Sequence, residues 1–192
     1  DKKIRVVGLI KGQVVTEHCI ETPTVRRAEV IADSERDLAK IVVVDKNSGS
    51  KRFFSGFVKG LGLNKGALAS SVAHDAHNFI AAGMDDSSIV SALNELRRLG
   101  GGLVAAFEDR VMASLPLPVG GLMCDGNALD VIQAIEEVEK AARDLGTPMP
   151  HPFMAMSFLS LSVIPELKIT DQGYVDLNRG GLMSFFVDDE DN

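Results

Sequence analysis

Residues 60–83 gather the side chains of this chain that could take part in chemistry. Two of its four histidines lie there, beside a carboxylate, an amide and a pair of hydroxyl groups. The candidate site residues are Ser70, Ser71, His74, Asp75, His77 and Asn78. Such groups can bind a metal ion, move a proton or hold a polar ligand. No other stretch of the sequence concentrates so many of them, so any direct role in chemistry is expected here.

The His74-Asp75-Ala76-His77 segment is compatible with a metal site and with a structural turn. Two imidazoles and the Asp75 carboxylate form a plausible ligand set for a divalent cation, although zinc sites with recognised spacing carry more ligands. In the alternative, both histidines hydrogen-bond to the backbone around a turn, while Asp75 and Asn78 satisfy turn amides. The residue types favour the structural alternative without excluding the metal.

Other catalytic patterns are incomplete. Ser70 or Ser71 with His74 and Asp75 supplies the residue types of a catalytic triad, but triads are usually assembled from separated segments. The chain has no GxSxG elbow, and its glycine cluster at 60–66 lacks the order of a phosphate loop or a dinucleotide fingerprint. The zinc nucleoside-deaminase signature is also missing. The sequence therefore contains no complete catalytic set, and no residue is assigned as catalytic or as a metal ligand.

Composition is that of a soluble globular domain. The 192 residues are 45% hydrophobic and 24% charged, and this length suffices for a proper core. The net charge of −7 and the scattered basic residues argue against a nucleic-acid partner and against an anionic membrane surface. Neither a bilayer-spanning apolar run nor a signal-peptide core is present, so no membrane association is expected.

The cysteines indicate a cellular compartment, and the first residue indicates a longer parent protein. Cys19 and Cys124 lie far apart and form neither a CxxC motif nor a disulfide framework. This usage predicts a reducing compartment, and hence a cytoplasmic location. Because the chain starts at Asp1 rather than Met, we expect it to be a piece of a longer protein.

The first half of the chain reads mainly as strands. Short β-branched runs predict strands at 3–10, 13–20, 38–45 and 51–59, with 21–37 as a polar surface connection. The candidate site is ambiguous, because its polar positions share one side of a helical wheel. Its bracketing glycines, serines and Asn78 nevertheless favour a strand, a tight turn at 74–77 and a second strand.

The second half adds two main helices, at about 86–99 and 128–145. The second helix has the apolar stripe Val131, Ile132, Ile135, Val138, Ala142 and Leu145. A hairpin is expected at 101–115, a stiff proline-rich linker at 148–152, and closing strands at 174–177 and 182–187. The Met-rich segment 153–164 must be buried in a core or an interface. Together these elements predict an α+β fold with a mostly antiparallel or mixed sheet.

Several long motifs, in order along the chain, carry a family resemblance. They occupy residues 7–10, 12–16, 56–63, 66–75, 77–78, 99–104, 114–118, 121–123, 152–154, 157–159 and 163–168. Together they closely resemble the C-terminal domain of bacterial and archaeal adenine deaminases, which are members of the amidohydrolase superfamily. The resemblance covers nearly the whole chain. The family usually has Ser where this chain has Ala76, so a hydroxyl role at that position is not carried over.

The resemblance implies the hydrolysis of adenine to hypoxanthine and ammonia, in purine salvage or adenine catabolism. It places the chemistry in a preceding (β/α)₈ barrel that holds a divalent metal, expected to be manganese, iron or zinc. Residues 1–192 would then form a single accessory domain, inactive alone, in a homo-oligomeric enzyme. The candidate site residues would face the mouth of that barrel and its substrate adenine.

Two alternatives from other functional classes stay open at this stage. In the first, the chain is an interaction or dimerisation module that docks through the Met-rich segment 153–164. In the second, it is an independent metal hydrolase that uses His74 and His77.

Overall fold

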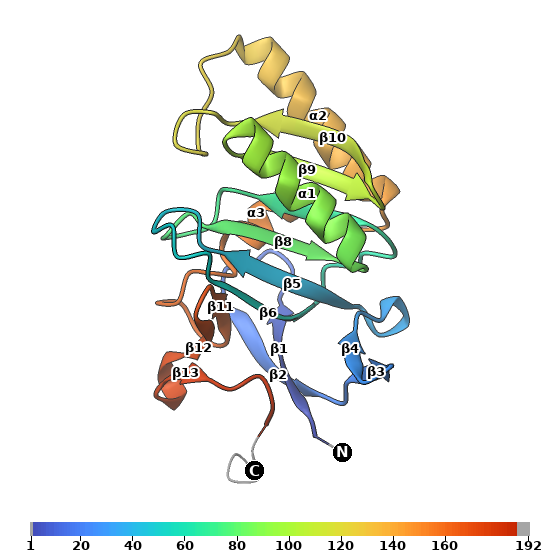
Figure 1. Ribbon diagram of the computed structural model, residues 1–192, viewed down its shortest axis with the longest axis vertical. Coiled ribbons are helices and arrows are strands. Elements are labelled where there is room, and N and C mark those ends of the chain that lie inside the picture. Colours follow the sequence, from blue (N-terminus) through green and yellow to red (C-terminus); the bar gives the residue numbers. More distant parts are fainter. Residues whose placement is uncertain (1, 188–192) are drawn as a thin grey trace.

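The computed structural model describes residues 2–187, which form a main mixed sheet, two smaller sheets and three α-helices (Figure 1). The main sheet contains β1 (Ile4–Leu9), β2 (Thr16–Glu21), β5 (Leu38–Val44), β6 (Phe53–Lys59), β7 (Ala67–Ser70), β8 (Phe79–Gly83), β9 (Gly102–Phe107) and β10 (Arg110–Pro116). Their order is β10-β9-β7-β8-β5-β6-β1-β2, and only the β1–β6 pair among them is parallel. The predicted α+β class is confirmed.

The candidate site is a strand, a turn and a strand, as predicted. β7 and β8 pair antiparallel, with Ser70 opposite Ile80, and a turn spans residues 74–77. Each strand has a second neighbour, since β7 also pairs with β9 and β8 with β5. The hairpin therefore lies inside the sheet, where both faces are covered. This explains why Ala67 to Ser70 are all buried and why the strand is apolar without alternation.

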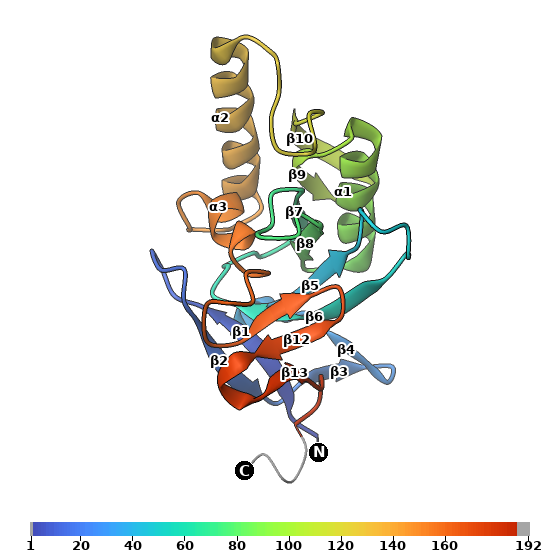
Figure 2. The same cartoon turned by 90° about the vertical axis from the view of Figure 1, so that its left-hand side faces the viewer.

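The two predicted helices lie on opposite faces of the sheet, with α1 (Asp86–Leu99) on β7–β10 and α2 (Ala128–Asp144) on β9 and β10, as Figure 2 shows. α1 begins where the Asp85 carboxylate accepts the Ser88 N–H at 2.8 Å, and it ends at Gly100 with φ 75°. α2 begins after the Asn127 cap. No helix within residues 2–187 combines the length and the apolarity needed to cross a membrane.

The predicted apolar stripe of α2 is only half correct. Val138, Ala142 and Leu145 are buried, but Ile132 is 53% exposed and Ile135 is 37% exposed. The physical reason is that α2 packs on β9 and β10, and its first turns project beyond β10 (Figures 1 and 2). The sequence periodicity was sufficient to define the helix, but it did not show where the supporting sheet ends.

Residues 21–37 lie at the surface between β2 and β5, as expected, since none of them is buried, but they are not irregular. They contain the hairpin of β3 (Thr24–Arg26) and β4 (Glu29–Ile31), followed by a 3₁₀ turn at Ser34–Arg36. The tight turn uses Arg27 and Ala28 with φ of 52° and 66°. Hairpin turns of this kind normally place Gly, Asn or Asp there. The usual sequence signal for the hairpin was therefore absent.

The Met-rich segment contains a third helix, α3 (Pro152–Ser157), which was not predicted. Pro152 occupies its first turn, a position that tolerates proline, so it does not belong to a linker. The predicted burial of this segment is confirmed only in part, because Met154 is 62% and Val163 67% exposed, whereas Phe153, Met156 and Leu159 are buried in the core. Because the core takes up these side chains, they are not available for the docking or dimerisation that the alternative hypothesis requires.

A three-stranded sheet packs against the main one. It consists of β11 (Lys168–Thr170), β12 (Gly173–Asp176) and β13 (Gly181–Met183). The strand predicted at 174–177 is therefore shifted by one residue, the strand predicted at 182–187 is shorter than expected, and β11 was missed. Tyr174 joins the two sheets, because its buried hydroxyl accepts the Phe57 N–H at 2.6 Å. On the other side, His18 Nδ1 lies 2.8 Å from Asp176 Oδ2.

Lys168, at this junction, predicts a pH dependence of stability. Its side chain is fully buried, its Nζ donates to the Val14 carbonyl at 2.8 Å, and burial lowers the pKa of Lys168 to about 8. Because the unfolded chain holds this proton up to pH ~10.4, it binds more protons than the folded state above pH 8. Lys168 should therefore add about 1–2 kcal/mol to the unfolding free energy as pH rises from 8 to 10.

Urea unfolding at both pH values, compared between wild type and Lys168→Met, measures this contribution. The variant should lack the gain, whereas the exposed control Lys51→Met should keep it. An equal pH dependence in wild type and Lys168→Met would contradict the assignment.

Candidate functional site

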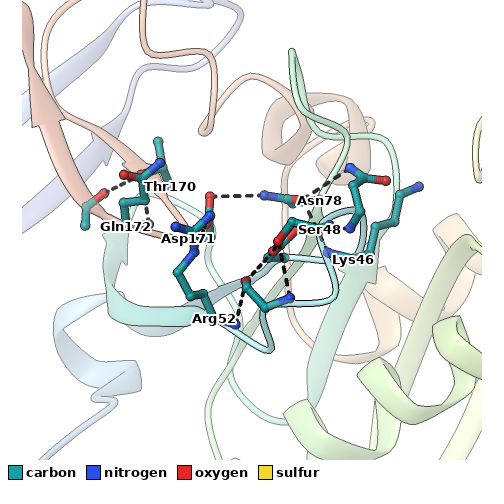
Figure 3. Close-up of polar contacts among 11 residues, drawn as sticks. Lys46, Ser48, Arg52, Asn78, Thr170, Asp171 and Gln172 are labelled. Atoms are coloured by element: carbon teal, nitrogen blue, oxygen red, sulfur yellow. Dashed lines mark hydrogen bonds and ion pairs between the residues drawn. The ribbon is translucent and has the colours of Figure 1, made fainter.

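The candidate site lies at one end of the main sheet, where four connections converge. The turn after β7 meets the 45–52 loop, the 117–123 loop and the 170–173 turn. These connections join different strands, so the site depends on the sheet for its geometry. Figure 3 shows Lys46, Asn78 and Asp171 as neighbours, although they come from different parts of the sequence.

Ser70 and Ser71 are fully buried and bonded internally. The Ser71 hydroxyl donates to the Gly121 carbonyl at 2.5 Å and accepts the Gly102 N–H at 2.7 Å. The Ser70 hydroxyl accepts the Val72 N–H at 2.9 Å. Within residues 2–187, neither serine is hydrogen-bonded to His74, so the residue types of a triad do not form its geometry. In this arrangement the serines position backbone.

Glycines allow the 117–123 loop to approach Ser71 closely. A Cβ on Gly121 would lie 3.2 Å from the Ser71 hydroxyl oxygen, and its φ is 77°. A Cβ on Gly101, with φ 128°, would lie 2.4 Å from the Gly121 Cα, which is shorter than any real contact. The glycines at 101 and 121 therefore let two backbone segments pack closely beside the site.

The turn itself is held by backbone bonds. The His74 N–H donates to the Ser157 carbonyl at 2.8 Å, and the His77 N–H donates to the Ala73 carbonyl at 2.7 Å. The His74 ring lies 5.1 Å from the Phe158 ring and 5.2 Å from the His77 ring, centroid to centroid. Asp75 is exposed. Among the described residues, the side chains of His74 and Asp75 have no hydrogen-bond partner.

His77 has a buried nitrogen without a partner. Its φ of 50° turns the chain, and its Nδ1 atom is inaccessible and unbonded within the described part of the molecule. Burial, assisted by the neighbouring His74 charge, lowers the pKa of His77, so the imidazole is neutral at pH 7. An unpaired buried polar atom costs about 1–3 kcal/mol.

Asn78 is the polar centre of the site, as Figure 3 shows. It is 6% exposed, and its Nδ2 donates to Asp171 Oδ1 at 3.2 Å. The second Asp171 oxygen lies 3.2 Å from Arg52 Nε. Asn47 Nδ2 donates to the Ala76 carbonyl at 2.8 Å. The turn is therefore fixed from two sides, by the 45–52 loop and by the smaller sheet.

Lys46 joins two walls of the site. Its Nζ donates to the Gly120 carbonyl at 3.0 Å and lies 5.7 Å from the centroid of the Phe79 ring. Burial lowers the pKa of Lys46. The sequence predictions did not include Lys46, Asn47, Arg52, Phe158 or Asp171. The only available signal was that the 47–50 and 170–173 segments read as turns.

The site residues do not supply a metal-binding set. No group of three or more His, Cys, Asp or Glu side chains in residues 2–187 is arranged to hold a metal ion. His74 and His77 lie close to each other, but Asp75 does not complete a ligand triplet with them. The described residues therefore do not fit a divalent metal, and an independent hydrolase that uses the two histidines has no ligand set here.

Comparison with known proteins adds the family. Residues 13–180 match the family model described as the adenine deaminase C-terminal domain. The adenine deaminase of Oleidesulfovibrio alaskensis is 48% identical over 177 residues, which are 92% of this chain and 31% of that protein. The adenine deaminase of Methanothrix thermoacetophila is 42% identical over 185 residues, which are 96% of this chain and 32% of that protein.

An archaeal relative, the adenine deaminase of Archaeoglobus fulgidus, is 43% identical over 176 residues, covering 91% of this chain and 30% of its own length. The chain thus spans about a third of the length of the curated relatives it matches. The match extends over the hairpin, both main helices and the site turn, so it includes all elements that build the candidate site. This chain belongs to the adenine deaminase C-terminal domain family.

Proposed function

We propose that this chain, residues 1–192, is the accessory C-terminal domain of an adenine deaminase that hydrolyses adenine to hypoxanthine and ammonia. The relatives that it matches are named adenine deaminase and are about three times as long. The chemistry would take place in a preceding amidohydrolase-type barrel of the same polypeptide. A cytoplasmic, homo-oligomeric enzyme of purine salvage is part of the same proposal.

The observation that carries a role at the active site is the unpaired polar turn. The side chains of His74 and Asp75 have no hydrogen-bond partner among the described residues, although the His74 ring packs against the rings of Phe158 and His77. Yet the backbone beneath them is fixed by bonds to Ser157, Asn47 and Ala73. A rigid turn that presents unsatisfied polar groups is suited to complete a pocket on another body.

In that position the residues of this chain would bind and orient substrate. The barrel places its active site at the loop-bearing face, so a turn that covers this face can contact the purine edge and exclude water. A neutral His77 can donate or accept a hydrogen bond, and Asp75 can accept one from an amino group. The divalent metal, whether manganese, iron or zinc, belongs to the proposed barrel, where it would make water nucleophilic at neutral pH.

Ammonia release from adenine tests the proposal that the preceding barrel is catalytic and this chain is accessory. The full-length polypeptide should be active, whereas the 192-residue chain, shown to be folded by a cooperative thermal transition, should release no ammonia above buffer. Deamination of adenine by the folded chain alone would overturn the accessory role. A full-length protein that deaminates another base but not adenine would overturn the substrate assignment.

A further inference from the structure

The first half of α2 presents an apolar flank to solvent. Leu129 is 73% exposed, Ile132 is 53% exposed and Ile135 is 37% exposed. Their spacing of three residues places them along one side of the helix. Single exposed apolar residues are common, but a contiguous exposed set marks an interaction site.

The same side of α2 is covered farther along the helix. Glu139 follows Ile132 by two turns, and its Oε1 lies 2.6 Å from His151 Nδ1 in the segment that leads into α3. The flank therefore faces neighbouring chain at its C-terminal end. Toward the N-terminus the helix projects past β10 (Figure 2), and Leu129, Ile132 and Ile135 are exposed there. Another body is needed to bury them.

Two more exposed apolar side chains lie in the segment that joins the candidate site to α2. Leu122 and Met123, which are 37% and 61% exposed, lie in the loop that leads into α2. That loop is bonded to the site, because the Gly120 carbonyl accepts Lys46 Nζ and the Gly121 carbonyl accepts the Ser71 hydroxyl. The segment that carries Leu122 and Met123 is therefore fixed to the candidate site at one end and enters α2 at the other.

The charge of this region argues against a second copy of the chain. Glu136 follows Ile132 by one turn on the same side of the helix, and Glu139 by two. Pairing two such flanks would bring like charges together in a chain whose net charge is −7. A body of different sequence avoids this repulsion, and the matched relatives carry about two thirds of their length outside this domain.

We propose that Leu122, Met123, Leu129, Ile132 and Ile135, here called the α2 docking surface, bind the preceding catalytic part of the same polypeptide. This rests on the proposed function, which supplies that preceding part. Burying these apolar side chains would stabilise the contact through the hydrophobic effect. The surface would thus hold the site turn against its target as well as exclude water from the junction.

Photo-crosslinking in the full-length protein tests the surface. p-Benzoylphenylalanine is placed at Ile132, and at Val90 of α1 as a control of matched exposure (55%) on the other face. The Ile132 variant should give about tenfold more crosslinks to the preceding part, since docking within one chain has a high effective concentration. An equal mixture of ¹⁴N- and ¹⁵N-labelled protein should yield crosslinked peptides of one isotope only.

Two outcomes would overturn the surface. One is mixed-isotope crosslinks at Ile132, which would identify a second copy as the occupant. The other is a crosslink yield no higher than that at Val90. Failure here is separable from failure of the proposed function: an enzyme that deaminates adenine without these crosslinks refutes only the surface, and one that gives the crosslinks without deaminating adenine refutes only the function.

Discussion

His74→Ala and Asp75→Ala in the full-length enzyme should each lower kcat/KM for adenine by about 100-fold or more, with Tm changed by less than about 2 °C. Neither side chain has a hydrogen-bond partner among the described residues, and Asp75 is exposed, so little folding free energy depends on them. Each variant would instead lose a side-chain contact with the substrate or with the barrel. Steady-state kinetics and thermal unfolding of the same preparations measure both quantities.

Asp109→Ala is the matched control, because Asp109 is also an exposed aspartate in a tight turn, between β9 and β10. It should change neither kcat/KM nor Tm. If His74→Ala and Asp75→Ala instead lower Tm and leave kcat/KM intact, the turn is structural and the proposed active-site role is wrong.

Gly56→Ala should lower the unfolding free energy by about 3 kcal/mol. A Cβ at this position in β6 would lie 2.3 Å from Tyr174 Oη and 2.6 Å from Tyr174 Cζ. The ring has little room to move, because it is fully buried and packs against Phe54, with 5.2 Å between their ring centroids. Displacing it would also break the hydrogen bond from the Phe57 N–H. Urea unfolding of the 192-residue chain measures the loss.

Two variants make this result specific. Gly49 has φ 69° with nothing within 4 Å of an added Cβ, so Gly49→Ala should cost only about 1 kcal/mol of backbone strain. Gly56→Ala combined with Tyr174→Phe removes the shortest contact and should recover part of the loss relative to Tyr174→Phe alone. A Gly56→Ala protein no less stable than Gly49→Ala would contradict the packing argument.

The fold was predictable where local chemistry decides it. α1 has an aspartate cap, an apolar stripe and a terminal glycine, and its predicted bounds agree with the structure. The β3–β4 hairpin was not predicted, because Arg27 and Ala28 adopt left-handed turn conformations without a glycine or asparagine signal. The exposure of the first half of α2 was not predicted for another reason. Periodicity indicates which side of a helix is apolar, but not whether a neighbouring element reaches it.

The site was predictable only in part, because its supporting residues come from distant parts of the sequence. Residue types alone located the 74–77 turn, since they depend on nothing outside the segment. Its supports come from far along the chain, as with Asn78 and Asp171, which are 93 residues apart. Ser71 likewise reaches Gly121 across 50 residues. Such partners follow from sheet order and register, which a single sequence does not specify.

A structure of the full-length enzyme with adenine or a stable analogue bound gives the distance from the His74 and Asp75 side chains to the ligand. We expect at least one of them within hydrogen-bond reach of the purine, directly or through one water. A turn that faces bulk solvent, with both side chains more than about 7 Å from the ligand and so out of reach of a bridging water, would contradict the central claim.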